Sequence, residues 1–393
     1  MNKILKKIII NINKVIAYAL VQIIRIFKIP KQNKDLWLIG GSLGRVYADN
    51  SASLHRYILK NHPDINVYWI INRNSPDVKK VKKISNKVLY RHSVKSNIYA
   101  LLANVHIMTH GKMDISDYRK DVFKFVYTVH LGHGVQGFKK IKIHPKLKRT
   151  FNRDYDLVLA NSKFEKKIKQ SWGLDENKVE ILGMSRYDEL LRKFKNINIK
   201  DRKILYMPTW RDWLVNNNNI KETRFYKEII SFLSNSLLNN LLSEENIKLN
   251  LYLHINMQEQ LNAFDNLDMR NINILPTEID LQHEIVTSEL LITDYSSICW
   301  DFLYLDKPVI FYQFDVSEYI NYRDSYIDLN QSLFGPTAYR SDNVTSLVKA
   351  YLNDEVISKD TEKWKSKMFR YFDDNNSKRI VSLILSKSGR KVL

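Results

Sequence analysis

Short apolar runs that alternate with helix-length stretches most constrain what this chain of 393 residues can fold into. The runs are rich in β-branched residues and lead into Gly, Ser, Asn or His. Strands that alternate with helices form parallel sheets that helices cover on both faces. A first series of runs comprises residues 35–40, 66–71, 87–90, 105–108, 125–129, 157–160 and 179–182, and a second comprises 204–206, 249–253, 272–275, 290–292 and 308–311.

The two series predict an α/β protein with two doubly wound domains. We expect the domains to comprise residues 35–195 and 196–393, the second with a C-terminal helical tail, and to join in the polar stretch 193–201. In such sheets, ligands bind beyond the carboxyl ends of the strands. The residues that follow each run are therefore the candidates for chemistry.

The stretch 290–305 predicts a buried strand, a hydroxyl-rich turn and a helix. The first N–H groups of a helix lack partners, and the helix dipole favours negative charge there. Ser296 and Ser297 can either donate hydroxyls to a phosphate or simply cap the helix. The other candidates in this stretch are Thr293, Asp294 and Asp301.

A candidate general base follows the run 125–129. His133 is flanked by Gly132 and Gly134, which allow a ligand to approach the backbone closely. An imidazole has an unperturbed pKa of about 6.5 and can accept a proton at neutral pH. The alternative is a loop histidine that only caps backbone groups, and we expect this supporting role for His130.

A second histidine, His254, follows the run 249–253. It can bind a diphosphate or protonate a leaving phosphate, or it can be a half-buried histidine with its hydrogen bonds satisfied. Thr209 and Arg211 follow the run 204–206, where the planar fork of an arginine suits phosphate oxygens. Asp212 can orient that arginine.

Arg186 and Asp188 follow the run 179–182. An Arg–Asp pair in a turn is as often structural as functional, so both interpretations stay open.

The net charge of the chain and the motifs that it lacks limit the classes of binding partner. The formal charge of +20 favours an anionic partner: nucleic acid, an anionic membrane surface or a polyanionic substrate. The sequence has no nucleic-acid-binding signature, Walker A loop or metal-ligand spacing, and Gly40–Gly44 resembles a dinucleotide-binding loop only loosely. Cys299, the single cysteine, excludes an intramolecular disulfide and a cysteine-based zinc site. We therefore expect no metal, no cofactor and no nucleic acid.

Residues 1–34 differ from the rest of the chain. They are rich in Ile, Leu and Val, but basic residues interrupt them, and the longest uncharged apolar stretch, 15–24, is ten residues long. A transmembrane helix needs about 20. The segment predicts an amphipathic helix that lies in a membrane interface, and the alternative is a helix docked on the chain's own core.

Taken together, these motifs resemble those of the CDP-glycerol glycerophosphotransferase family, the polymerases and primases of teichoic acid synthesis. The resemblance extends over residues 35–345 and is most specific in the Pro-Thr-Trp-Arg-Asp and Thr-Asp-Tyr-Ser-Ser segments. The matching segments are 131–134, 183–188, 204–212, 291–297, 301–302, 307–312 and 335–336.

His133 and His254 occupy the positions of the two functional histidines of the family. The residues around them depart from the family pattern, in which the first histidine begins a His-Gly-Thr-Pro segment, the second precedes a proline, and a further proline stands in the turn before Arg186. The departures are Val135, Gln136, Ile255 and Ser185. They indicate a divergent branch of the family.

The resemblance implies a GT-B arrangement, in which two Rossmann-like domains face a cleft. It implies a peripheral enzyme on the cytoplasmic face of the cell membrane, whose N-terminal domain takes a lipid-linked or polymer acceptor and whose C-terminal domain takes CDP-glycerol or CDP-ribitol. An acceptor hydroxyl would attack the phosphorus that bears the polyol, and CMP would leave. His133 would take the proton, whereas Asp294 and Asp301 would support the loop or the ribose of the donor.

Two other functions stay open on the sequence: a GT-B glycosyltransferase that uses a nucleotide sugar, and a non-catalytic membrane-bound protein that binds anionic polymer. The sequence does not predict an oligomeric state.

Overall fold

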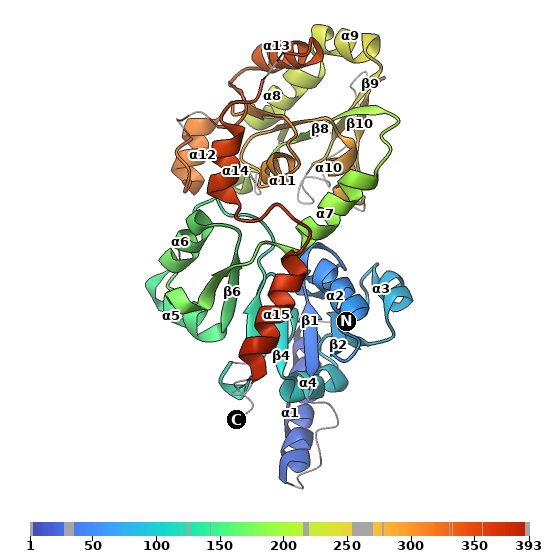
Figure 1. The fold of residues 1–393 in the computed structure, drawn as a ribbon, viewed down its shortest axis with the longest axis vertical. Coiled ribbons are helices and arrows are strands. Elements are labelled where there is room, and N and C mark those ends of the chain that lie inside the picture. The colour runs from blue at the N-terminus through green and yellow to red at the C-terminus, as the bar shows by residue number, and fades with distance from the viewer. Residues whose placement is uncertain are drawn as a thin grey trace. The chain divides into compact units, whose positions relative to one another are not determined.

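Two parallel β-sheets, each in its own unit, organise the chain (Figure 1). In the computed structural model, unit 1 comprises Met1–Gly134, Ile143–Glu189 and Arg370–Leu393, and unit 2 comprises Val135–Lys142 and Leu190–Phe369. The structure describes residues 3–26, 35–118, 120–123, 126–141, 143–214, 220–253, 270–276, 279–329, 331, 333–355 and 357–389. The α/β class expected from the alternating runs is confirmed.

The sheet of unit 1 has seven parallel strands in the order β3-β2-β1-β4-β5-β6-β7. The strands are β1 (Leu36–Gly40), β2 (Asn66–Ile71), β3 (Val88–Tyr90), β4 (Val105–Met108), β5 (Tyr127–His130), β6 (Leu157–Ala160) and β7 (Val179–Ile181). The helices are α1 (Lys3–Ile26), α2 (Asp49–Asn61), α3 (Val78–Ile84), α4 (Val94–Leu102), α5 (Pro145–Asp154), α6 (Lys163–Ser171) and α15 (Asn376–Ser388), with 3-10 turns η1 (Ser42–Gly44), η2 (Lys112–Asp114), η3 (Lys120–Phe123) and η4 (Glu176–Lys178). The strand order reverses between β1 and β4, the kind of position where such sheets bind ligands.

Each face of this sheet has its own hydrophobic core. Trp37 and Ile39 of β1 enter one core, whereas Leu38 between them enters the other. Successive side chains of a strand point to opposite faces, so a strand covered on both sides is apolar throughout. This explains why the runs in the sequence are continuous rather than alternating.

The sheet of unit 2 has six parallel strands in the order β10-β9-β8-β11-β12-β13. The strands are β8 (Arg202–Met207), β9 (Ile247–Leu251), β10 (Ile272–Ile274), β11 (Leu290–Thr293), β12 (Val309–Tyr312) and β13 (Thr337–Ala338). The helices are α8 (Arg224–Leu233), α9 (Ser236–Glu244), α10 (Leu281–Thr287), α11 (Cys299–Tyr304), α12 (Val316–Arg323), α13 (Ser341–Leu352) and α14 (Thr361–Met368), with 3-10 turns η5 (Asp212–Leu214) and η6 (Ile220–Glu222). The helix α7 (Ser185–Asn196) begins in unit 1 and ends in unit 2. Here the order reverses between β8 and β11.

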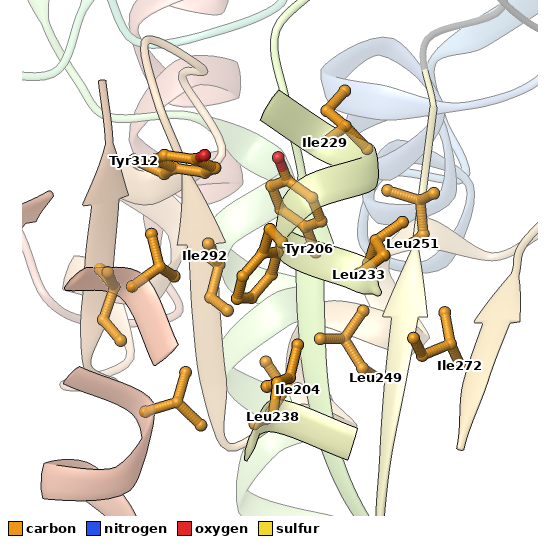
Figure 2. Close-up of a cluster of buried hydrophobic side chains, with 14 of the residues drawn as sticks. Ile204, Tyr206, Ile229, Leu233, Leu238, Leu249, Leu251, Ile272, Ile292 and Tyr312 are labelled. Atoms are coloured by element: carbon orange, nitrogen blue, oxygen red, sulfur yellow. The ribbon is translucent and has the colours of Figure 1, made fainter. Parts of the chain in front are cut away.

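A core of aliphatic and aromatic side chains holds helices α8 and α9 on the unit 2 sheet (Figure 2). Leu249 and Leu251 of β9 and Ile292 of β11 pack there against Leu233 and Leu238 of the two helices, and all five side chains are buried. The strand ends that follow this core are thereby held in place.

The C-terminal helix α15 belongs to a different unit from the one that the sequence predicted. We expected a tail of the second domain, but Arg370–Leu393 belongs to unit 1. Ile380, Val381 and Ile384 of α15 are fully buried in a unit 1 core, and α15 contacts α2. Helical periodicity predicts an apolar face but not which sheet that face covers.

The helix α1 docks on unit 1 with one side only. Ala17 and Val21 are fully buried, α1 contacts α4, and the Asn13 side chain donates a hydrogen bond to the His92 carbonyl at 3.0 Å. Much of the remaining surface is apolar and exposed, including Ile4 and Val15 at 68% and 69%. Within the described residues, α1 is the helix long and apolar enough to cross a membrane by length and composition. The docked interpretation therefore applies to one side of the helix, and the membrane-facing interpretation stays a prediction for the exposed side.

Candidate functional site

Two histidine side chains meet at the carboxyl ends of neighbouring strands in unit 1. His110 lies just after β4 and His133 just after β5, and the two strands pair with Met108 opposite His130. The imidazole rings of His110 and His133 stack, with centroids 4.5 Å apart and an interplanar angle of 10°. The structure thereby brings two imidazoles together beside the reversal of the unit 1 sheet.

The sequence indicated His133 but not His110. The signal was present, because His110 also follows an apolar run and precedes a glycine, Gly111, whose φ is +151°. The pairing could not be found in the sequence, because it depends on β4 and β5 being neighbours.

Asp114 fixes the loops on both sides of this reversal. Its carboxylate accepts hydrogen bonds from the backbone N–H groups of Thr109 at 3.0 Å, His110 at 2.8 Å and Leu43 at 2.7 Å. The N–H of Ser42 in the loop after β1 donates to Nδ1 of His110 at 3.2 Å. One buried carboxylate thereby positions both the His110 backbone and the glycine-rich loop Gly40–Gly44, and the latter acts as a support.

The loop that carries His133 is held from the other side by α2. The Asn50 side chain, fully buried, donates to the Gly132 carbonyl at 2.8 Å. Gly132 has a φ of +74°, a conformation that a residue with a side chain adopts only with strain, whereas the expected close approach at Gly134 involves no positive φ. His133 itself remains exposed.

The surroundings keep both rings of the pair neutral at physiological pH. Burial of its inner side, together with the neighbouring His110, lowers the pKa of His133 to about 4. Burial also lowers the pKa of His110, and Arg45 acts in the same direction. A neutral imidazole with an exposed edge can accept a proton from a substrate.

His130 lies in the interior of unit 1, and its supporting role stays a prediction. It is buried against the Tyr155 ring at a centroid distance of 4.9 Å, and burial lowers its pKa to about 3. Beneath it, Lys169 and Glu165 form a buried ion pair at 3.0 Å.

The structure gives Arg186 and Asp188 structural partners. Asp188 accepts hydrogen bonds from the backbone N–H groups of Asn376 at 2.9 Å and Ser377 at 2.7 Å, and so caps α15. Arg186 lies 3.5 Å from the Asp49 carboxylate and over the Tyr187 ring. Arg186 and Asp188 therefore have separate structural partners in this turn.

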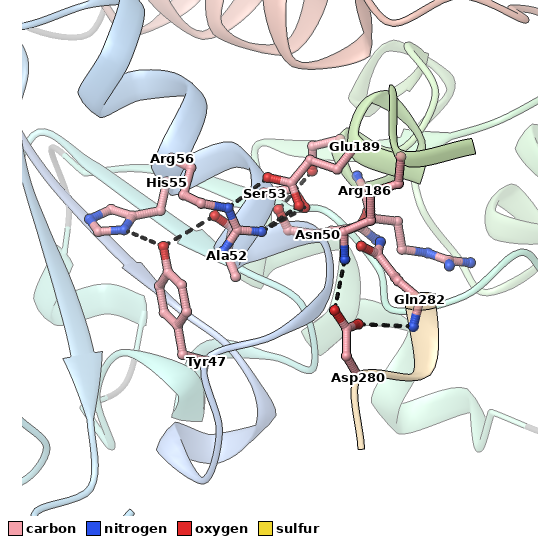
Figure 3. Close-up of polar contacts among 12 residues, drawn as sticks. Tyr47, Asn50, Ala52, Ser53, His55, Arg56, Arg186, Glu189, Asp280 and Gln282 are labelled. Atoms are coloured by element: carbon pink, nitrogen blue, oxygen red, sulfur yellow. Dashed lines mark hydrogen bonds and ion pairs between the residues drawn. The ribbon is translucent and has the colours of Figure 1, made fainter. Parts of the chain in front are cut away.

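A polar network beside this turn links α2 to α7 (Figure 3). Glu189 accepts hydrogen bonds from the Arg56 guanidinium at 2.6 Å and from the Ser53 hydroxyl at 3.0 Å. The Tyr47 hydroxyl and His55 lie 3.0 Å apart in the same region. These bonds hold the start of α2, and with it Asn50, in position.

In unit 2 the corresponding strand ends carry a buried ion network. Arg211 is fully buried, and its guanidinium binds Asp315 through two hydrogen bonds of 2.7 and 2.8 Å. A third nitrogen lies 2.8 Å from Asp294. Burial alone would lower the pKa of Arg211, but the two carboxylates raise it, so the side chain stays charged.

This geometry corrects the role expected of Arg211. The fork that was expected to face a phosphate is occupied by two carboxylates of the protein, because a buried guanidinium is stable only when it is paired. Arg211 and Asp294 instead tie the loops after β8 and β11 together, and Asp294 also accepts the Thr209 N–H at 2.9 Å. The Thr293 hydroxyl donates to the Met207 carbonyl at 2.6 Å.

The hydroxyl-rich turn before α11 differs from the expected helix cap. The helix begins only at Cys299 and has six residues, and neither serine caps its first turn: Ser296 accepts one weak bond, from the Ile298 N–H at 3.5 Å. Ser297 is exposed and Ser296 is half-buried, so both lie at the surface of the loop. Asp301 is buried in the first turn of α11.

Two expected site residues cannot be placed. His254 lies outside the described residues, and so does the side chain of Asp212. Their roles stay predictions.

A comparison with known protein families identifies the relatives of this chain. The profile of the family described as CDP-Glycerol:Poly(glycerophosphate) glycerophosphotransferase matches residues 23–386. The chain belongs to this family. The resemblance that the motifs indicated is thereby confirmed.

Relatives in this family come from teichoic acid synthesis. The minor teichoic acid biosynthesis protein GgaB of Bacillus subtilis (strain 168) is 25% identical over 365 residues, which are 88% of this chain and 39% of GgaB. The teichoic acid poly(ribitol-phosphate) polymerase of Bacillus spizizenii is 26% identical over 285 residues, 65% of this chain and 43% of that protein. The chain therefore spans less than half the length of these two relatives. A teichoic acid poly(glycerol phosphate) polymerase of Bacillus spizizenii is 25% identical over 374 residues and is covered to 89% of its length.

Solved structures share the fold. The wall teichoic acid polymerase TagF superimposes with a TM-score of 0.65 at 18% identity, covering 99% of both chains. A putative UDP-N-acetylglucosamine 2-epimerase from Listeria monocytogenes has a TM-score of 0.58 at 13% identity, covering 91% of this chain and 97% of that one. The GT-B-like class expected from the resemblance is thereby confirmed.

Proposed function

We propose that this chain transfers glycerol phosphate, or the related ribitol phosphate, from a CDP-activated donor to a hydroxyl group of a lipid-linked or polymer acceptor. The family membership supports the reaction class, and the named relatives include polymerases of both polyol phosphates. The single observation that carries the proposal is the stacked pair of His110 and His133, whose neutral rings lie at the reversal of the unit 1 sheet.

In the proposed reaction, the acceptor hydroxyl gives its proton to the His133 imidazole while its oxygen attacks the phosphorus that bears the polyol. The bond between this phosphorus and the CMP oxygen breaks, and CMP leaves with the electron pair. A negatively charged substrate beside the ring raises the pKa of His133 from about 4 towards neutrality, where an imidazole is an efficient base. His110 stacks on the ring and fixes its orientation.

For the donor we propose the loops of unit 2. The hydroxyl groups of Thr209, Ser296 and Ser297 would donate hydrogen bonds to the diphosphate. His254 would bind the diphosphate as well. The Thr209 hydroxyl supports this assignment, because it is a buried group at a strand end that makes no hydrogen bond to the described residues. Arg211, Thr293, Asp294 and Asp301 are positioning residues, since their side chains lie in the protein interior.

For the location we propose the cytoplasmic face of the membrane, with α1 lying in the interface. The exposed apolar residues of α1 and the exposed basic residues Lys6 and Lys7 support this placement, because such helices insert their apolar side and bind anionic headgroups through their basic side.

An assay with different activated donors distinguishes the proposed function from the alternatives. The full chain is incubated with a synthetic lipid-linked acceptor and with CDP-glycerol, CDP-ribitol or a UDP-sugar, and the products are analysed by mass spectrometry. A polyol phosphate added to the acceptor, with release of CMP, supports the proposal. Release of UDP with a glycosidic product identifies a glycosyltransferase, and tight polymer binding without turnover of any donor identifies a binding protein.

A further inference from the structure

Unit 1 contains a cavity of about 690 Å³ that the proposed reaction does not use. It lies between the first half of α1 and the loops that follow β1, β2 and β3. Since the strands are parallel, all three loops are at the carboxyl edge of the sheet, the edge that also carries His110 and His133.

The walls of the cavity are cationic. The basic residues that line it are Lys6, Arg45, Arg73 and Arg91, and no acidic residue is among its lining residues. Arg91 is held by a hydrogen bond of 3.1 Å to the Leu43 carbonyl and a 3.3 Å ion pair with Asp117, whose carboxylate lies outside the lining. The other two arginines are exposed. Two exposed guanidinium groups and a lysine, with no carboxylate among the lining residues, suit a phosphate or diphosphate.

One wall of the same cavity is apolar. Ile9 and Ile10 of α1 and Tyr90 at the end of β3 line it, with the Arg73 guanidinium 4.7 Å from the centre of the Tyr90 ring. The apolar wall continues along α1 into exposed residues such as Ile8 and Ile12, which are exposed to 48% and 52%. A ligand that fits both walls has an anionic head and a long apolar chain.

The cavity is linked to the histidine pair through the loop after β1. The Leu43 carbonyl receives the Arg91 hydrogen bond, whereas the Leu43 N–H binds Asp114, which also holds His110. Strand β2 is separated from β4 by β1 alone, so the cavity edge and the pair are roughly 10 Å apart by strand spacing. This separation leaves room for a sugar or polyol unit between a head phosphate and a reacting hydroxyl.

We propose that this cavity binds the phosphate head of the long-chain lipid that carries the acceptor. The lipid chain leaves along Ile9 and the exposed side of α1, while the group attached to the phosphate extends along the sheet edge towards His133. The inference rests on the proposed function, since it names the part of the acceptor that the enzyme holds.

A binding experiment tests the cavity without requiring turnover. The full chain is titrated calorimetrically with dodecyl phosphate below its micelle concentration, and with inorganic phosphate and dodecyl maltoside as separate probes. Dodecyl phosphate should bind most tightly, because it alone satisfies both walls. The double variant Arg45→Glu/Arg73→Glu should weaken its binding by roughly 100-fold or more, since two charge-assisted contacts are lost.

The matched control reverses two charges elsewhere in unit 1. Lys79 and Lys80 on α3 are exposed and do not line the cavity, so Lys79→Glu/Lys80→Glu should bind dodecyl phosphate within about twofold of the parent. Equal losses in both double variants would show a general charge effect and overturn the proposal. Equal binding of dodecyl maltoside and dodecyl phosphate would overturn it as well.

Vesicle sedimentation separates a single bound lipid from attraction to a bilayer. With phosphatidylglycerol vesicles, Arg45→Glu/Arg73→Glu should keep most of its binding, because the exposed apolar side of α1 is unchanged. If vesicle binding falls as far as dodecyl phosphate binding, the two arginines serve only the attraction to a bilayer, and the proposal is overturned.

Kinetics then connect the cavity to the reaction. The Arg73→Glu variant keeps Arg45, and therefore its effect on His110, and should raise KM for the lipid-linked acceptor by roughly tenfold with little change in kcat. An acceptor of the same structure without the lipid phosphate should show no such difference. No transfer by the unmodified chain with any acceptor would reject the proposed function, whereas transfer with an unchanged KM in the variant would reject only the cavity.

Discussion

The two sheets carry polar groups at the same topological position and use them differently. In unit 1 the reversal between β1 and β4 exposes a neutral pair of imidazoles, whereas in unit 2 the reversal between β8 and β11 encloses Arg211 between Asp294 and Asp315. A titratable group with an exposed edge can exchange protons with a substrate. A buried ion network is paired within the protein and shielded from solvent, so it fixes loop geometry. Position at a strand end therefore does not by itself identify a catalytic residue.

The largest expected effect concerns the chemistry of unit 1. Replacing His133 with Ala removes the proposed base and should reduce transfer from CDP-glycerol by about 10²- to 10⁴-fold, measured as CMP release. Because the side chain is exposed, unfolding by urea should change little. The control is His283→Ala, an exposed histidine of α10, which should retain full activity. Transfer at the parental rate in His133→Ala would remove the base from the mechanism.

The next prediction concerns unit 2, where we expect a substitution to reduce stability rather than to remove a catalytic group. Arg211→Met leaves two buried carboxylates without their counter-charge and should lower the free energy of unfolding by about 3–5 kcal/mol. Urea denaturation followed by circular dichroism measures this loss. Arg202→Met serves as the matched control, because Arg202 binds Glu245 and Glu289 at the surface, and it should cost about 0–1 kcal/mol. Similar costs for both variants would contradict the stabilising role of the buried network.

A smaller effect depends on pH and on the buried histidines of unit 1. Burial lowers the pKa of His55 and of His130 from 6.5 to about 3 in the folded state. Below pH 6.5 the unfolded chain therefore binds protons at these histidines that the folded chain does not bind. The free energy of unfolding is highest above pH 6.5 and decreases as the pH falls towards 3. Each group contributes a slope of about 1.4 kcal/mol per pH unit.

This slope can be assigned by substitution. Urea unfolding of the parent and of His130→Gln at pH 7.5, 6 and 5 should show a shallower loss in the variant, because one of the two groups no longer titrates. Parallel curves would mean that His130 is already accessible to protons in the folded protein.

The smallest expected effect is structural and lies at the C-terminal helix. Asp188→Ala removes the carboxylate that binds the first N–H groups of α15 and should cost about 1 kcal/mol. Thermal unfolding measures the loss. Transfer activity at saturating substrate should remain at the parental level, since the side chain caps a helix and does not contact the proposed site. A loss of kcat without a loss of stability would return Asp188 to the list of functional candidates.

The sequence predicted most strands to within a few residues because strands covered on both faces are continuous apolar runs. β13 was missed, because Thr337–Ala338 is too short to show a pattern. The candidates His133 and Thr209 were chosen by the same logic, since each follows such a run, and their roles stay predictions. Arg211 was assigned the wrong partner, because nothing in its local sequence shows that Asp315, more than 100 residues away, is buried beside it.

By itself, the sequence determined the α/β class, the two sheets, the strand-end positions of the polar loops and the family to which the chain belongs. Only the tertiary structure decided that His110 stacks on His133, that Arg211 is enclosed and that α15 completes unit 1. Local patterns of apolar and polar residues specify which elements form, because backbone geometry has a fixed period. They do not specify which elements are neighbours, and burial and pKa depend on the neighbours.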